Sequence, residues 1–105
     1  MGQVYVFFMQ NGFSQLDGFE WDEGNRDKNR LKHKVSTGEC EEVFFNQPLI
    51  ILADHKHSKE EQRYAAYGMT NDGRRLMVYF TVRETKYRVI YARDMHRKER
   101  KFYDR

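Results

Sequence analysis

Arginine, lysine and histidine are the residues of this sequence whose types and spacing best suit chemistry on a phosphate. Arg63 and Arg93 lie on predicted strands whose alternation places apolar and aromatic side chains beside each of them. The predicted face of Arg63 also carries Ala65, Tyr67 and Met69, and that of Arg93 carries Tyr87, Val89 and Tyr91.

An arginine in such a place either extends its charged end to the sheet edge or binds an anion. Arg83 ends another predicted strand, and Lys32 and His33 lie on a basic segment with few apolar residues. Together these cations favour phosphate binding, because a guanidinium group binds two phosphate oxygens at once.

Other kinds of site have weaker support. Residues 54–57 contain an aspartate and a His-x-His pair that can chelate a metal, but the neighbouring lysines favour an ordinary polar connection. We therefore predict no metal site. No glycine-rich phosphate loop follows a predicted strand, and no cofactor is predicted. Cys40 is expected to be a core thiol. Glu41 and Glu42 are expected to lie on an acidic helix face and to be solvated.

Length and composition fit one soluble domain over residues 1–105, with 39% apolar and 33% charged residues. Residues 39–61 carry a net charge of −4 between basic regions at 22–38, 62–92 and 93–105, so the cations are clustered. No apolar stretch approaches the roughly 20 residues of a membrane span. The absence of a basic N-terminal signal region and the single cysteine favour a cytoplasmic location.

The patterning predicts an α+β domain, with an antiparallel sheet of about four strands, two N-terminal helices and a basic C-terminal helix. Strands are predicted at 49–53, 63–69, 76–82 and 87–92, with a further one at 4–8. Residues 1–18 are interpreted as an extra N-terminal strand region.

Three helix starts are predicted from capping residues. Asp22 precedes a helix at 23–34 that has almost no apolar residues. Ser36 and Glu39 form a capping box for a second helix, whose stripe is Cys40, Val43 and Phe44. Asp94 is predicted to cap the last helix, whose thin apolar stripe is Met95, Phe102 and Tyr103.

An ordered set of short motifs resembles the BrnT toxin family over residues 19–103. The set comprises Phe19-Glu20-Trp21-Asp22, Asn29, Lys32-His33, Val43-Phe44, His57-Ser58, Glu61, Arg63, Gly68, Gly73-Arg74, Phe80-Thr81, Arg83, Arg88-Val89-Ile90, Ala92-Arg93, Arg97-Lys98-Glu99-Arg100 and Tyr103. Three departures are Lys34, where the family usually has glycine, Asn46-Gln47-Pro48, which replaces an Asp-Pro, and Tyr91, where it has a small residue.

The resemblance implies a ribonuclease toxin of a bacterial type II toxin–antitoxin pair, with a RelE-like fold, that cleaves RNA and inhibits translation. It implies a BrnA-like antitoxin with a ribbon-helix-helix region, so operator DNA is contacted only through the antitoxin. Neither a membrane nor a cofactor is implied. The competing hypothesis is a catalytically inactive module of the same fold that binds RNA or the antitoxin.

Cleavage of this kind needs no metal, because the 2′-OH of RNA attacks the adjacent phosphorus. We expect Arg63, Arg83 and Arg93 to stabilise the developing charge, and Lys32 to bind phosphate. His33 is either the acid–base group or a surface histidine hydrogen-bonded to the sheet. The further RNA-binding residues are Lys28, Arg97 and Arg100.

Four residues have two interpretations each. Glu99 acts as a base or pairs with Arg83 or Arg93, and His96 is a second acid–base candidate or solvated. Trp21 belongs to the core in preference to stacking on a base. Tyr91 either narrows a substrate cleft beside Arg93 or fills the core.

Overall fold

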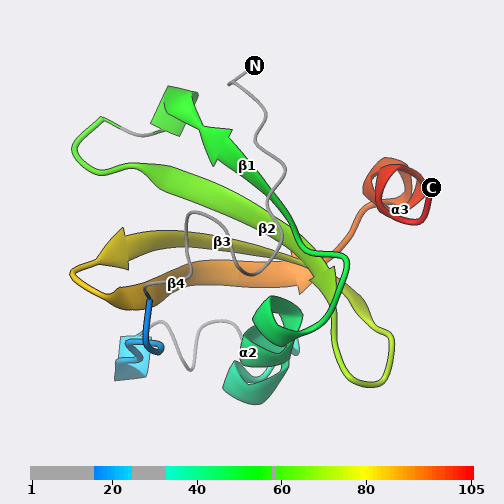
Figure 1. Cartoon of the computed structure of the whole chain (residues 1–105), viewed down its shortest axis with the longest axis horizontal. Helices are drawn as coiled ribbons and strands as arrows, with labels where there is room; N and C mark the ends of the chain where they lie inside the picture. The colour runs from blue at the N-terminus through cyan, green and yellow to red at the C-terminus, as the bar shows by residue number, and fades with distance from the viewer. Residues whose placement is uncertain (1–15, 25–32, 58) are drawn as a thin grey trace.

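A four-stranded antiparallel sheet with one helix on each face organises the chain (Figure 1). The structure is a computed structural model that describes residues 16–24, 33–57 and 59–105. Its elements are α2 (Thr37–Phe45), β1 (Ile50–Asp54), the 3-10 turn η1 (His55–His57), β2 (Arg63–Met69), β3 (Arg75–Arg83), β4 (Lys86–Asp94) and α3 (Arg97–Tyr103). None of the described helices is long and apolar enough to cross a membrane.

The strands lie in the order β1-β2-β3-β4, so each one pairs with its neighbour in the chain. All four lie where the sequence patterns predict them, within a few residues at each end. The turn between β2 and β3 contains Gly73 at φ 86°, a left-handed conformation that glycine adopts without steric cost. The predicted antiparallel sheet is thereby confirmed.

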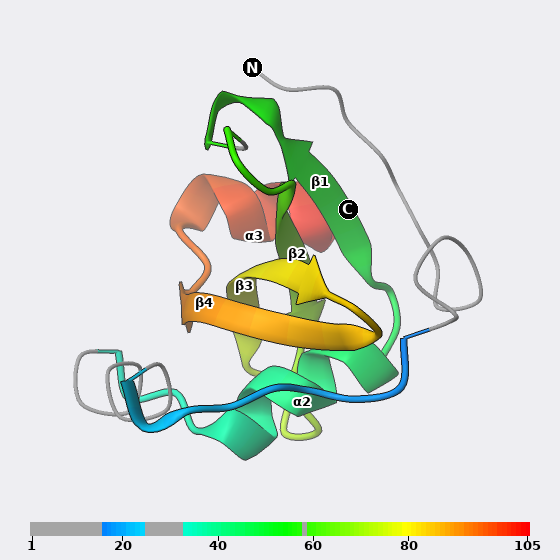
Figure 2. The same ribbon diagram turned by 90° about the vertical axis from the view of Figure 1, so that its left-hand side faces the viewer.

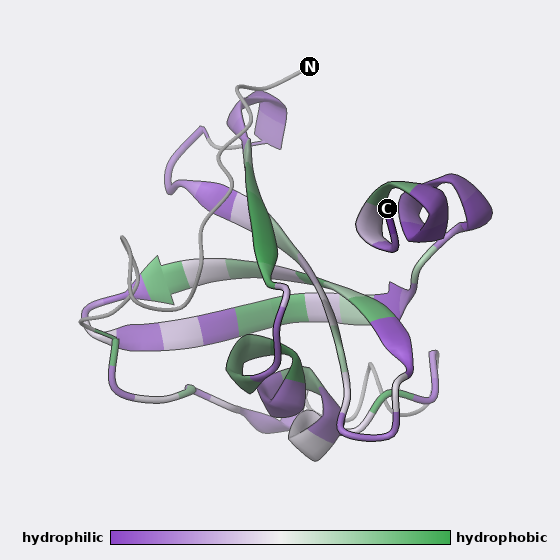
Figure 3. Ribbon diagram, turned by 45° about the vertical axis from the view of Figure 1, so that its right-hand side comes forward, coloured by the Kyte–Doolittle hydropathy of each residue, from purple (hydrophilic) through white to green (hydrophobic). Residues whose placement is uncertain are grey.

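The main core lies between α2 and one face of the sheet. The predicted capping box is present, with Ser36 Oγ accepting from the Glu39 amide at 3.1 Å. Cys40, Val43 and Phe44 are all buried, as the stripe predicts, and burial raises the pKa of the Cys40 thiol to about 12. When the ribbon is coloured by hydropathy, apolar residues appear on the strands and α3 is mostly hydrophilic (Figure 3).

The described segment 16–24 contacts the sheet at the edge formed by β4. Phe19 forms a parallel bridge with Tyr87 of β4, and Trp21 packs partly buried against the core, as predicted. The indole Nε1 of Trp21 donates to Glu41 at 2.8 Å. Glu42 accepts from the backbone amide of Asn71 at 2.9 Å. The prediction that both glutamates are merely solvated is therefore wrong, because each carboxylate has a specific donor.

α3 lies on the face opposite α2 (Figure 2). Its Phe102 contacts Tyr67 of β2, with ring centroids 6.3 Å apart, and Tyr103 donates its hydroxyl to the carbonyl of Pro48. The prediction that Asp94 caps the last helix is wrong. Asp94 ends β4 and binds Arg74, and His96 is the N-cap residue, whose amide donates to Glu99 at 2.7 Å.

A bulge in β4 changes which side chains face which way. Tyr79 pairs with Tyr91 but Phe80 pairs with Val89, so Ile90 is an extra residue between them. Tyr91 and Arg93 consequently face away from α2, whereas Val89 is buried beneath it. The prediction that Arg93 shares a face with Tyr87 and Val89 is therefore wrong.

The predicted helix 23–34 is only partly described. Residues 23–24 are helical, but His33 lies in a turn and Lys34 has φ 56°, so the helix does not extend to its predicted end. The predicted strand at 4–8 and most of this helix lie outside the described residues. Of the two predicted N-terminal helices, α2 is confirmed.

Candidate functional site

The sheet face opposite α2 carries two of the predicted arginines, Arg63 and Arg93, in separate cross-strand rows. The first row, at the end of the sheet farthest from α3, consists of Asp54, Arg63, Thr81 and Arg88. The second consists of Leu52, Ala65, Tyr79 and Tyr91, and the third of Ile50, Tyr67, Met77 and Arg93. α3 packs on the third row through Tyr67 and Arg93. In the first row Asp54, Arg63 and Arg88 are partly exposed, and Thr81 is buried.

A cleft of about 370 Å³, called here the Arg63 cleft, lies over the first row. Its lining residues are Asp22, Gly24, Glu61, Arg63, Thr81, Arg83, Arg88, Val89 and Ile90. Two of the predicted arginines, Arg63 and Arg83, therefore meet here. Arg83 is half exposed, and its Nε lies 3.6 Å from Glu61, a loose surface ion pair.

Arg88 is a third arginine of this cleft, and sequence reasoning did not include it in the site. Its Nη1 donates to Glu20 at 3.0 Å and its Nη2 to Asp22 at 2.6 Å. The hydrogen bond to Asp22 is the main cause that raises the pKa of Arg88 above its ordinary value, and the bond to Glu20 adds to it. Arg88 lies five residues before Arg93 on the same strand, and regular alternation would place the two side chains on opposite faces. The bulge between them brings both to the same face, which the sequence pattern does not show.

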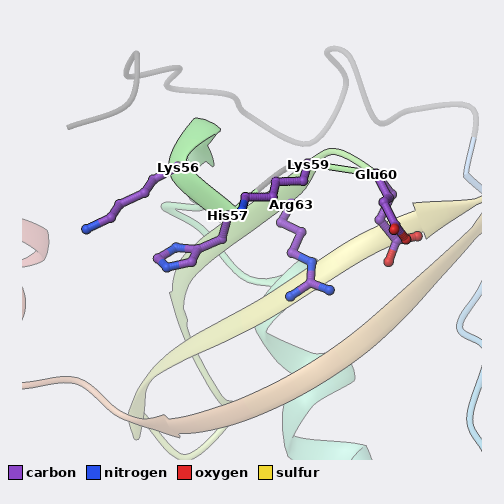
Figure 4. A pocket seen from close by; sticks show the side chains of 6 residues that line it. Lys56, His57, Lys59, Glu60 and Arg63 are labelled. Atoms are coloured by element: carbon purple, nitrogen blue, oxygen red, sulfur yellow. The ribbon is translucent and has the colours of Figure 1, made fainter.

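A second cavity of about 300 Å³, called here the His57 cavity, adjoins the first. It is lined by Lys56, His57, Lys59, Glu60, Glu61 and Arg63 (Figure 4). Arg63 and Glu61 therefore border both spaces. His57 Nδ1 lies 2.8 Å from Asp54 Oδ2, and its backbone amide donates to Oδ1 at 3.3 Å.

Asp54 is held from the sheet side as well, because the Tyr79 hydroxyl donates to Oδ2. Burial acts to raise the pKa of Asp54, but the hydrogen bonds from Tyr79 and His57 outweigh it and lower the pKa. Burial and the Asp54 carboxylate together raise the pKa of Tyr79 to about 12. Among residues 16–24, 33–57 and 59–105, no three His, Cys, Asp or Glu side chains gather as a metal site.

Arg93 and His33 lie away from these cavities. Arg93 is two rows from Arg63, and its guanidinium binds Glu99 at 2.7 and 3.1 Å. The predicted pairing of Glu99 with an arginine is thus found, with Arg93 as the partner. The ring centroid of His33 lies 6.4 Å from that of Tyr91, and its carbonyl accepts from Arg74 at 3.3 Å.

The remaining predicted residues divide into two groups. Arg97 and Arg100 are exposed on α3, and His96 is exposed at its start. Lys28 and Lys32 lie outside the described residues. Tyr91 is on the same face as Arg63 and packs against Tyr79, with ring centroids 5.3 Å apart, so it does not fill the core under α2.

Arg74 is a structural centre that sequence reasoning missed. It binds Asp94 at 2.7 Å and Glu39 at 3.1 Å, and also donates to the carbonyls of His33 and Lys34. The Asp94 hydrogen bond is the main cause that raises the pKa of Arg74. Nothing in the local sequence indicates this role, since the four partners lie 20 to 41 residues away.

A family model described as the ribonuclease toxin BrnT of a type II toxin–antitoxin system matches residues 21–99. No curated protein matches the sequence. The matched stretch includes the whole sheet and both cavities.

Proposed function

The chain belongs to the BrnT family of ribonuclease toxins of type II toxin–antitoxin systems, and from this premise we propose that it cleaves RNA internally without a metal ion. The 2′ oxygen attacks the adjacent phosphorus and the bond from phosphorus to the 5′ oxygen breaks. The 2′-OH gives up its proton to a base and the leaving 5′ oxygen takes one up. The products carry a 2′,3′-cyclic phosphate and a 5′-hydroxyl.

The observation that carries this proposal is the convergence of Arg63, Arg83 and Arg88 on one cleft at the open end of the sheet. A pentacoordinate phosphorane carries more negative charge than the starting diester. Guanidinium groups fixed around it therefore stabilise the transition state more than the ground state. The ion pair between Arg83 and Glu61 is long and exposed, so Arg83 can leave Glu61 and bind a phosphate at a small cost in free energy.

Arg63 has the most central position among these groups. It lies mid-row between Asp54 and Thr81, and it borders both the Arg63 cleft and the His57 cavity. We assign the scissile phosphate to this point. The exposed Arg97 and Arg100 of α3, with Lys28, Lys32 and His33, would extend phosphate binding beyond it.

The antitoxin proposed for this chain is a BrnA-like ribbon-helix-helix protein that covers the Arg63 cleft. A partner that inhibits by occlusion needs a surface of standard size, about 800 Å² on each side. The cations of the cleft favour an acidic segment of that partner, because opposite charges speed association. Operator DNA would then be bound through the antitoxin.

The second candidate function is an inactive module that keeps RNA or antitoxin binding. Tyr91 favours it, because this large ring lies on the same sheet face as Arg63, where the family carries a small residue. Cleavage distinguishes the two candidates.

The test is cleavage of a defined RNA in excess EDTA by the wild type and by an Arg63→Ala, Arg83→Ala double variant. Arg75→Ala is the matched control, because Arg75 starts β3 at the end opposite Arg83 and pairs with Asp104. We expect cutting by the wild type and the control, loss of cutting by the double variant, and resistance of RNA with a 2′-deoxy nucleotide at the cleaved position.

Equal cutting by wild type and double variant would contradict the assignment of the arginines. Cutting of the 2′-deoxy substrate would contradict the mechanism. An inactive wild type that still binds RNA would favour the second candidate.

A further inference from the structure

We propose that His57 is the base that removes the proton from the 2′-OH of the RNA, with Asp54 as its positioning residue. The proposal rests on the RNA cleavage proposed above and adds the group that this reaction needs. It is carried by the hydrogen-bonded chain His57–Asp54–Tyr79 and by the place of His57 beside Arg63.

Asp54 fixes the tautomer of the His57 ring. An ionised carboxylate only accepts hydrogen bonds, so the 2.8 Å contact requires the hydrogen on Nδ1. In the neutral ring, Nε2 then carries the lone pair. The His57 side chain is 62% exposed against 25% for Asp54, so the pair is held at its carboxylate end and accessible at its imidazole end.

Asp54 is itself held by two elements. The backbone amide of His57 donates to Oδ1, and the Tyr79 hydroxyl reaches Oδ2 from the central strand β3. Tyr79 is 9% exposed, so its ring is anchored in the sheet. A carboxylate that orients an imidazole and stabilises the imidazolium formed during reaction is the arrangement by which histidine acts as a base in hydrolases.

The position of His57 connects this pair to the proposed phosphate site. His57 and Arg63 line the same cavity (Figure 4). Asp54, which holds His57, is the cross-strand neighbour of Arg63. A phosphate bound by Arg63 places its ribose within reach of the His57 cavity.

The charged and titratable groups around His57, taken over the described residues, come from three strands and one connection. They are Asp54 of β1, Arg63 of β2 with Tyr79 of β3, and Lys56, Lys59, Glu60 and Glu61 of the β1–β2 connection.

The proton balance is simple. Nε2 of neutral His57 takes the 2′ proton as the 2′ oxygen bonds to phosphorus, and the imidazolium keeps its Nδ1 hydrogen bond to Asp54. The bond from phosphorus to the 5′ oxygen breaks, and solvent supplies the proton that the 5′ oxygen takes up. The imidazolium then releases its proton to solvent.

The experiment measures pH–rate profiles for cleavage of a defined RNA in EDTA by full-length wild type, His57→Ala and Asp54→Asn. His55→Ala is the matched control, because His55 lies in the same 3-10 turn but outside the cavity lining. We expect His57→Ala to lower kcat about 10²- to 10⁴-fold and to remove the limb of the profile that reports the base. Added imidazole should restore part of the rate.

Asp54→Asn should lower kcat with KM unchanged, and His55→Ala should match the wild type. A substrate with sulfur in place of the leaving 5′ oxygen separates base from acid, because a thiolate needs no protonation. The slow rate of His57→Ala should persist with this substrate.

Restoration of the His57→Ala rate by the 5′-thio substrate would overturn the assignment as base. A wild-type rate and profile in folded His57→Ala would overturn any role in proton transfer, while the cleavage proposal would stand. An inactive wild type would overturn the cleavage proposal and this one with it.

Discussion

Arg93 and Glu99 face each other through two parallel hydrogen bonds, Nη1 to Oε1 at 2.7 Å and Nη2 to Oε2 at 3.1 Å. Both side chains are about four-fifths buried, and they join β4 to α3. Glu99 also accepts from the amide of His96 at the start of α3 and from the hydroxyl of Tyr67. The pair therefore anchors α3 on the sheet.

We expect Arg93→Ala to lower the free energy of unfolding by about 2–3 kcal/mol, because it leaves the carboxylate of Glu99 largely buried without its cation. Urea unfolding measures this. Arg97→Ala, which removes an exposed cation from the same helix, should change the free energy by less than about 0.5 kcal/mol. Equal stability of wild type and Arg93→Ala would contradict the anchoring role.

Acid should destabilise the fold through the carboxylates that bind Arg74 and Arg93. The Arg74 hydrogen bond lowers the pKa of Asp94; for Glu39 and Glu99, burial acts to raise the pKa but the arginine and amide donors lower it overall. Carboxyls with a lowered native pKa contribute stability that is complete above their unfolded values, near 4, and is lost as the pH falls through the native values.

The measurement is urea unfolding between pH 7 and pH 3. Wild-type stability should fall steadily below about pH 4.5, whereas Arg74→Ala should start lower and fall less steeply. Parallel curves for the two proteins would show that the Arg74 network does not cause the acid loss.

Gly68→Ala should destabilise the contact between β2 and α2. A Cβ at this position would lie 2.8 Å from Val43 Cγ1 and 3.0 Å from the Val43 carbonyl oxygen, so the helix must move away from the strand. We expect a loss of about 1–3 kcal/mol by thermal or urea unfolding. Gly38→Ala is the control, since its Cβ would meet nothing closer than 3.9 Å, and in α2 it should keep or raise the midpoint.

Lys34→Gly should stabilise the chain. Lys34 has φ 56°, a left-handed conformation that costs a non-glycine residue about 1 kcal/mol, and glycine avoids that cost at the expense of greater freedom in the unfolded chain. The expected gain is about 0.5 kcal/mol in urea unfolding. Lys34→Ala keeps the Cβ and should give no gain, so a similar gain in both variants would point to removal of the lysine charge instead.

The salt dependence of RNA affinity should increase with the number of arginines in the Arg63 cleft that contact phosphates. For single strands, each phosphate contact contributes a slope of about −0.7 in the plot of log affinity against log salt. Arg83→Ala should make the slope less steep by about that amount with little change in sequence preference, measured on uncleavable 2′-deoxy strands. An unchanged slope would place Arg83 outside the contact, and Arg75→Ala serves as the control.

The strands and α2 could be predicted because their information is local. Alternation predicts β2, runs of β-branched and aromatic residues predict β3 and β4, and the capping box of Ser36 and Glu39 predicts the start of α2. Asp94 failed as a cap because Arg74, twenty residues away, binds its carboxylate. Alternation could not foresee the bulge at Ile90, and so Arg93 was assigned to the wrong face.

The site could be predicted only in part for the same reason. Arg63 and Arg83 meet at one cleft, as their places on neighbouring strands suggest. The sequence shows His57 and Asp54 only as neighbours in a polar connection. The contact with Tyr79 that fixes Asp54 depends on two strand pairings and is invisible in the local pattern.

The match between strand order and chain order has a consequence for how quickly the sheet forms. Each of its three pairings closes a short connection, so the entropy lost at each step is small, and successive hairpins can assemble without waiting for distant segments. The bridge from Phe19 to Tyr87 spans 68 residues and is the slow exception. We therefore expect the sheet face that carries Arg63 and Arg88 to be complete before residues 16–24 pair with the edge of β4.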